Sequence, residues 1–287
     1  AAIQQYRGLK HSDDTHDAFW LAEMLRLKVL PEGYIYPKEQ RAIRDLLRTR
    51  CRLVQNRTSL ILSLQNTLAR NGEAKLTAAQ IKAVRTDPVT PLLETNEDLL
   101  LSGMAIKKAV DFLTVEIRDL EKEILNRVRL ESSYEGLLTL PGVGRILALT
   151  ILLETGPVDR FLRVGNYVSY CRKVPTSWTT NGKYKGRGNK KNGNRYLAWA
   201  FSEASEFARR YDRVCRAFFD RKASKTNRMV AHQALAHKLA RAAYFIMRDG
   251  VSYQASKLFT GSIGRGGEPQ KGLDPQPPDL IGSRPGH

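Results

Sequence analysis

Acidic residues, cysteines and long apolar runs are all scarce in this sequence. No stretch of about 20 uninterrupted apolar residues occurs, so no membrane-spanning helix is expected. The three cysteines, Cys51, Cys171 and Cys215, are far apart and odd in number, which argues against a disulfide framework or a zinc knuckle. No signal-peptide pattern is visible, and a reducing cytoplasm is the expected location.

The shortage of acids leaves a strong positive charge. Lys and Arg number 47 against 29 Asp and Glu, for a net charge of +18 and a pI near 10.0. Such a field attracts polyanions, so nucleic acid is the expected partner and an anionic membrane surface the alternative. With 287 residues and 42% hydrophobic side chains, the chain can bury a core in one or two domains.

Apolar spacing predicts a mainly α protein. A helix is expected from Ser12, which can cap it, to Pro31 and Gly33. Residues 38–70 keep a three-to-four apolar period, and a second run alternates four and three as in a coiled-coil seam. That run is Ile106, Val110, Leu113, Ile117, Leu120 and Ile124. We expect the two long helices, each about 45 Å, to pair antiparallel as a stalk or dimerisation arm.

Shorter helices are predicted after Glu131, with a glycine-containing turn between two of them. The segment Leu140-Pro141-Gly142-Val143-Gly144 has the form of a helix-hairpin-helix turn, in which glycines let backbone amides approach a phosphate. Arg145 adds positive charge at the same place. The alternative is a tight turn between packed helices that binds nothing.

A basic segment follows. Residues 160–202 hold ten Lys or Arg and no Asp or Glu, and residues 175–194 are predicted to be a loop. Its cations can neutralise phosphates, and Trp178 or Tyr184 can stack on a base. A solvated charge run is the alternative, although solvated faces usually mix both signs. The expected nucleic-acid-binding residues are Gly142, Gly144, Arg145, Lys183, Lys185, Arg187, Lys190, Lys191 and Arg195.

Asp14 and Asp17 lie three residues apart on the first predicted helix. This spacing places both carboxylates on one face, where they can share a divalent cation such as Mg²⁺. Acidic residues that only favour the helix N-terminus are the alternative.

Three segments together resemble the insertion sequence 110 family of bacterial transposases, the 110/116/902 group, also described as bridge-RNA-guided recombinases. They are Gly8-Leu9-Lys10 through Asp14, Asp17 and Ala18 to Leu21-Ala22-Glu23; Leu140-Pro141-Gly142-Val143-Gly144; and Asn181-Gly182-Lys183 through Asn192-Gly193-Asn194-Arg195-Tyr196-Leu197-Ala198-Trp199-Ala200. The resemblance covers the chain to about residue 259, and the third segment is the most specific.

This resemblance implies a ribonuclease-H-like domain with four Mg²⁺-binding acids, a coiled-coil arm and a helical domain with a nucleophilic serine. Asp14 and Asp17 match the last two acids, so the first two are expected upstream of this chain. The position of the family's serine is occupied by Thr180 in this chain, and Ser177 is the alternative nucleophile. A third possibility is that Thr180 is an ordinary loop residue with no reactive role. The implied reaction is DNA strand exchange through a covalent 5′-phosphoryl link, with a guide RNA choosing the target and two protomers sharing the site.

The predicted domains are a ribonuclease-H-like remnant at 1–36, a coiled-coil arm at 37–131, a helical transposase domain at 132–259 and a disordered tail at 260–287. The leading hypothesis is an N-terminally truncated transposase or recombinase whose catalysis is impaired by the truncation and by Thr180. On this hypothesis the protein acts on DNA, is a dimer or tetramer held together by the coiled coil, and is associated with the bacterial nucleoid. A non-catalytic nucleic-acid-binding protein is the alternative, and a purely structural coiled coil ranks behind because it leaves the charge without a purpose.

Overall fold

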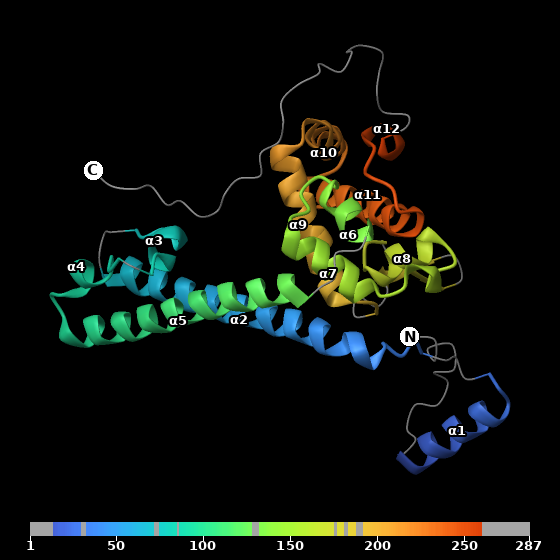
Figure 1. Ribbon diagram of the computed structural model, residues 1–287, viewed down its shortest axis with the longest axis horizontal. Helices are drawn as coiled ribbons and strands as arrows, with labels where there is room; N and C mark the ends of the chain where they lie inside the picture. The colour runs from blue at the N-terminus through green and yellow to red at the C-terminus, as the bar shows by residue number, and fades with distance from the viewer. Residues whose placement is uncertain are drawn as a thin grey trace. The chain divides into compact units, whose positions relative to one another are not determined.

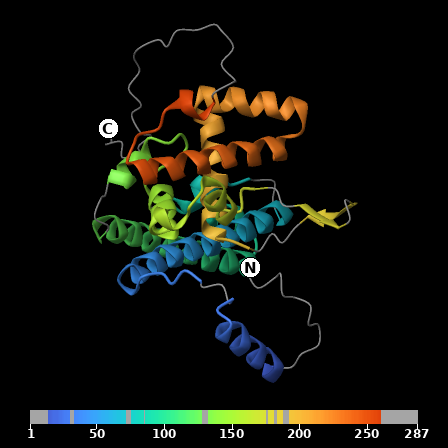
Figure 2. The same ribbon diagram turned by 90° about the vertical axis from the view of Figure 1, so that its right-hand side faces the viewer.

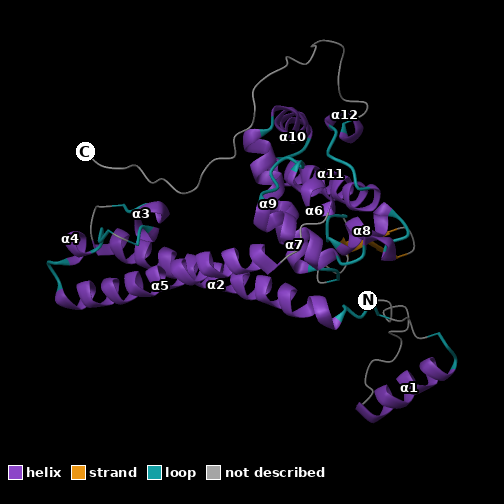
Figure 3. Ribbon diagram, in the orientation of Figure 1, coloured by secondary structure: helices purple, strands orange, loops and turns teal. Residues whose placement is uncertain are grey.

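The computed structural model describes residues 14–29, 33–71, 75–84, 86–127, 132–174, 177–180, 183–187 and 192–259. Helices dominate these residues, and one short pair of strands accompanies them (Figure 3). The prediction of a mainly α protein is confirmed. The Ser12 cap, Pro31 and the tail at 260–287 lie outside the described residues. Within the described ranges, every helix is too short or too polar to cross a bilayer.

The chain divides into two units, residues 1–253 and 254–287. The second unit contributes α12 (Ala255–Leu258) to the described residues. The first unit contains α1 (Asp14–Arg26), α2 (Lys38–Asn71), α3 (Ala78–Lys82), α4 (Thr90–Leu93), α5 (Glu97–Arg127), α6 (Ser132–Leu138), α7 (Arg145–Thr155), the 3-10 helix η2 (Val158–Arg160), α8 (Val164–Tyr170), β1 (Ser177–Thr180), β2 (Lys183–Arg187), α9 (Arg195–Tyr211), α10 (Arg213–Lys225) and α11 (Arg228–Asp249). The predicted domain boundaries and the ribonuclease-H-like remnant stay predictions.

The two long helices α2 and α5 pack against each other and run in opposite directions (Figure 1). Arg50 Nε donates to Glu121 Oε1 at 2.7 Å, and seven residues further along α2 the Arg57 guanidinium donates to Thr114 at 3.3 Å. Thr114 lies seven residues before Glu121, so the pairing is antiparallel. We refer to this pair as the helical arm.

Burial along α5 follows the predicted seam. Val110, Ile117 and Ile124 are buried at intervals of seven residues, while Leu113 and Leu120 are partly buried between them. A seven-residue repeat keeps one apolar stripe facing a partner helix. Supercoiling of the pair stays a prediction.

The segment between the two long helices forms two short helices. It contains α3 and α4, and α3 begins with a capping box in which Thr77 and Gln80 satisfy each other's backbone amides. Gly103 lets α4 approach α5 closely, because a Cβ there would lie 2.5 Å from Leu93 Cδ1. These short helices cover a core of Ile61, Leu64, Leu68, Ile81, Val89, Leu93 and Val110.

Helices α6 to α11 form a bundle, which we call the helical domain. Asn194, Asp212 and Asn227 each accept backbone N–H bonds at the start of α9, α10 and α11, which explains where these helices begin. Gly250, in the left-handed region at φ 63°, ends α11. The largest fully buried side chains of the helical domain include Leu137, Leu140, Leu149, Ile151, Tyr167, Leu197 and Phe201.

Candidate nucleic-acid interface

The turn between α6 and α7 uses its two glycines in different ways. Gly142 has φ +77°, and a Cβ at this residue would lie 2.1 Å from Ala204 O and 2.6 Å from Ala208 N on α9. Gly142 is therefore required for close packing of the turn against α9. Gly144 is the N-cap of α7, has φ −91°, and has nothing within 4 Å of an added Cβ.

The start of α7 is open to a partner. Gly144 offers no side chain to cap the first amides, and Arg145, the first residue of the helix, is exposed. Leu140 and Val143 are buried beneath the turn. Uncapped amides at the start of an eleven-residue helix, next to an arginine, fit a phosphate group.

The segment predicted as a loop contains an antiparallel ribbon instead. Ser177 pairs with Arg187, Trp178 with Gly186, Thr179 with Tyr184 and Thr180 with Lys183 (Figure 2). Gly186 has φ +143° beside the irregularity between Trp178 and Thr179. The prediction of an all-loop segment is wrong for these strands. A sequence signal existed, because Asn181-Gly182 between two runs rich in Thr, Trp and Tyr is the strongest short hairpin pattern.

The ribbon places Thr180 at the last paired position of β1, directly opposite Lys183, whose side chain is exposed. The side chains of Thr180, Lys185 and Arg187 lie outside what the structure describes, as do Lys190 and Lys191 entirely. The pairing brings the candidate nucleophile and one candidate phosphate contact together at the ribbon end.

The chain that returns from the ribbon is held by backbone contacts to α8. Gly193 has φ +90°, and a Cβ there would lie 2.4 Å from Tyr170 O. Asn194 N donates to Tyr170 O at 2.7 Å, and the Arg172 guanidinium donates to Gly193 O at 2.8 and 3.1 Å. Gly193 and Asn194, which the sequence reading placed in the phosphate-binding loop, therefore anchor the base of the ribbon segment.

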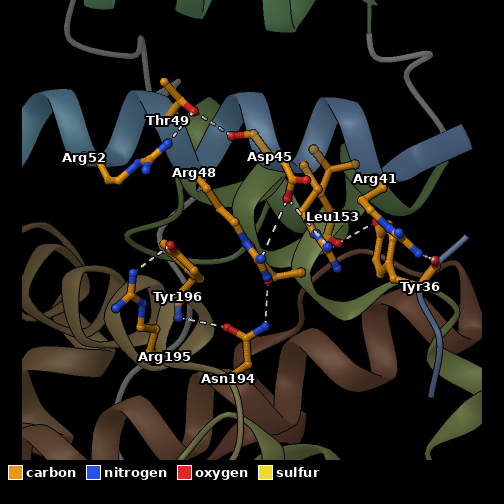
Figure 4. Close-up of polar contacts among 12 residues, drawn as sticks. Tyr36, Arg41, Asp45, Arg48, Thr49, Arg52, Leu153, Asn194, Arg195 and Tyr196 are labelled. Atoms are coloured by element: carbon orange, nitrogen blue, oxygen red, sulfur yellow. Dashed lines mark hydrogen bonds and ion pairs between the residues drawn. The ribbon is translucent and has the colours of Figure 1, made fainter. Parts of the chain in front are cut away.

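Asn194 also belongs to a buried polar network that sequence reasoning missed. Its Nδ2 donates to Glu154 Oε2 at 2.6 Å, and the Arg48 guanidinium donates to both Glu154 oxygens at 2.6 and 2.7 Å. The Glu154 side chain is 2% exposed, so its charge is neutralised almost entirely inside the protein. Figure 4 shows the Arg48 side chain pointing from α2 toward Asn194 and Tyr196.

This network joins the helical arm to the helical domain. Arg48 lies over the Tyr196 ring at 4.7 Å, and the exposed Arg195 lies 4.9 Å from the same ring centroid. Near the start of α2, Tyr36 Oη donates to Leu153 O at 2.6 Å, and burial raises its pKa to about 12. The arm is thus attached at the residues that end α7 and begin α9.

Lys173 is buried at the point where the chain leaves α8 toward the ribbon. It is 4% exposed, its Nζ donates to Ser202 Oγ at 2.7 Å, and its carbonyl contacts His237 Nδ1 at 3.0 Å. Loss of hydration lowers the pKa of Lys173 from 10.5 to about 8. Burial also raises the pKa of the Cys171 thiol well above its usual value, so this thiol is not an activated nucleophile.

The Lys173→Met variant tests this desolvation. Since the folded state releases the Lys173 proton near pH 8 and the unfolded state only near 10.5, the wild type gains stability with rising pH across that window. We expect the wild-type free energy of unfolding, minus that of the variant, to increase by about 2–3 kcal/mol from pH 7.5 to pH 10.5. Urea denaturation at both pH values measures the difference, and an equal pH slope in the two proteins would contradict it.

The predicted metal ligands lie on α1. Asp14 is the first residue of this helix and is exposed, whereas the Asp17 side chain lies outside what the structure describes. Within the described ranges, no group of three or more His, Cys, Asp or Glu side chains is placed to hold a metal ion. The two acids therefore do not complete a ligand set by themselves.

A family model matches the part of the chain that carries this interface. Residues 134–220, from α6 into α10, match the model of the transposase IS116/IS110/IS902 family. Over these residues the chain is similar to that family of transposases.

Curated relatives agree with the family model. A "Probable family 20 transposase" of Pseudomonas aeruginosa is 27% identical over 198 residues, 67% of this chain and 57% of the relative. The "Transposase for insertion sequence element IS1111A" of Coxiella burnetii is 28% identical over 163 residues, 54% of this chain and 43% of the relative. The IS1328 transposase of Yersinia enterocolitica is 27% identical over 149 residues, 50% of this chain and 44% of the relative. The chain thus matches about half the length of these relatives.

Proposed function

We propose that this chain acts in the transposition of an insertion sequence, and that its helical domain binds DNA through the α6–α7 turn and the ribbon segment. The observation that carries the proposal is the acid-free run at 160–202, which holds ten Lys or Arg and lies inside the matched transposase domain. The chain is anchored in the helical core on both sides of the ribbon, at Lys173 before it and at Asn194 after it.

Thr180 is the proposed nucleophile. Its Oγ1 attacks the phosphorus of a DNA phosphodiester, an Oγ1–P bond forms and the P–O3′ bond breaks. The 5′-phosphoryl end stays on the protein, and the departing 3′ oxygen takes up a proton equivalent to the one that the hydroxyl loses. Cations of the ribbon segment, such as Lys183 opposite Thr180, offset the charge that builds on the phosphate oxygens.

The partners follow from the same proposal. Asp14 and Asp17 contribute to a Mg²⁺ site whose further acidic ligands lie outside the described residues, and a guide RNA selects the target. The helical arm is proposed to bring two protomers together, as a dimer or tetramer. When bound, Mg²⁺ stabilises negative charge on phosphate oxygens.

Binding to a DNA duplex at increasing salt tests the electrostatic part. If the interface neutralises about six phosphates, the logarithm of the binding constant falls with the logarithm of salt concentration at a slope near −5. Arg145→Ala is expected to weaken binding and reduce this slope by about 1, because one phosphate contact is lost. Failure of the wild-type chain to bind DNA or RNA at low ionic strength would refute the proposal.

Trapping of a covalent adduct tests the chemistry. We expect a protein–DNA adduct with Mg²⁺, cognate RNA and a chain that also carries the upstream acids, and none with Thr180→Ala. Thr180→Ser is the matched control, because it restores the hydroxyl type that the family resemblance implies. If neither the wild type nor the serine variant forms an adduct, a second candidate gains support. This is a non-catalytic nucleic-acid-binding protein, favoured by the threonine at this position.

A further inference from the structure

A second surface, at the end of α9, has aromatic rings exposed among arginines. Phe207 and Tyr211 are 41% and 78% exposed, and their rings are nearly parallel, with centroids 6.3 Å apart and an interplanar angle of 13°. The preceding turns of α9 supply the core residues Leu197, Phe201 and Ala204. Because both rings remain exposed beyond this core, packing inside the helical domain does not account for them.

This aromatic pair lies beside the α6–α7 turn. Gly142 fits against the backbone of Ala204 and Ala208, and Tyr211 follows these two residues on the same face of α9 at the spacing i, i+4, i+7. The turn with its open amides and the Tyr211 ring thus border one surface. A polynucleotide whose phosphate lies at Gly144 passes close to the aromatic pair.

The surroundings of the pair are basic. Residues 206–228 contain eight Lys or Arg against three Asp or Glu. Two of these acids are engaged locally: Glu206 pairs with Arg209 and Arg210, and Asp212 accepts from Cys215 N at 2.7 Å as the cap of α10. Arg213, the first residue of α10, is exposed beside Tyr211.

We infer that Phe207 and Tyr211 form a stacking platform for the bases of an unpaired DNA segment, whose phosphates contact the neighbouring arginines and the α6–α7 turn. A duplex hides its base faces within its own stack, so only unpaired bases can use the rings. An acidic peptide matches the charge but brings no planar group to stack. The inference rests on the proposed function, because strand cleavage and exchange is the step that exposes unpaired DNA.

Binding of the full chain to a single-stranded DNA oligonucleotide and to a duplex of the same sequence tests the inference. We expect Tyr211→Ala to weaken single-strand binding by about 5- to 150-fold, which corresponds to the loss of one stacked base, and to leave duplex binding unchanged. Tyr211→Phe, which keeps the ring, is expected to stay within about twofold of the wild type. Phe207→Ala is expected to show the same selectivity as Tyr211→Ala.

The other outcomes overturn the inference. An equal loss for single strand and duplex assigns Tyr211 a general role, and no loss shows that the ring contacts no base. Tighter binding to the matching RNA than to the DNA single strand assigns the surface to RNA. A change in the sedimentation of the protein caused by Tyr211→Ala assigns the surface to contact with a second copy of the chain. A wild type that binds neither DNA form contradicts the proposed function itself, whereas duplex binding with no Tyr211 effect contradicts only the platform.

Discussion

The Gly142→Ala variant is expected to lose about 2–5 kcal/mol of unfolding free energy. The positive φ of +77° costs an L-residue about 1–2 kcal/mol. The added Cβ would also overlap Ala204 O at 2.1 Å, and separating the turn from α9 costs about 1–3 kcal/mol more. Urea denaturation followed by circular dichroism measures the loss.

Gly144→Ala in the same turn is the matched control. Its φ is −91° and the space for a Cβ is open, so we expect a loss below about 1 kcal/mol, the usual scale for a Gly-to-Ala change at an N-cap. For DNA binding we expect the opposite order, with the larger loss for Gly144→Ala. A methyl group at Gly144 obstructs a phosphate that approaches the α7 amides. Equal stability losses at both positions would contradict the assignment of packing to Gly142 alone.

Arg48→Met is expected to lower the unfolding free energy by about 3 kcal/mol. The Glu154 carboxylate, 2% exposed, is left without its cationic partner, and removal of one member of a buried ion pair typically costs about 3–5 kcal/mol. The lower end applies because Asn194 still donates to Glu154 at 2.6 Å. The ribbon base is expected to loosen at the same time, with faster amide exchange at Asn194.

The Arg48→Met/Glu154→Gln double variant shows whether charge is the cause. Because a neutral amide needs no cation, we expect the double variant to lose at least about 1 kcal/mol less than the sum of the two single variants. Arg52→Met is the control on the same helix, since Arg52 is exposed, and it should stay within about 0.5 kcal/mol of the wild type. Additive losses from Arg48 and Glu154 would show that the contact carries no coupling.

The Arg48 network also has a consequence for DNA handling. Arg48 belongs to the helical arm, whereas Asn194 begins α9 at the base of the ribbon that carries Thr180. The Arg48 guanidinium therefore links the proposed oligomerisation element, through Glu154, to the base of the proposed catalytic segment. If two protomers align their arms, this contact places the ribbon at a defined position relative to the arm.

Local signals in the sequence predicted much of the fold. The apolar period of the two long helices and the α6–α7 turn appear where the residues indicated. The ribbon was missed because glycines and lysines were interpreted as loop residues, although the Asn181-Gly182 hairpin signal was present.

The sequence by itself determined the helical class, the antiparallel arm and the basic character of the ribbon segment, because these depend on periodicity and on charge along the chain. Only the tertiary structure separated Gly142, which packs on α9, from Gly144, which stays open. It alone brought together Arg48, Glu154 and Asn194, of which Arg48 lies 106 residues and Asn194 lies 40 residues from Glu154 in the chain. The physical reason is that a residue's role depends on what surrounds it after folding, and neighbours contributed by distant segments leave no pattern in the local sequence.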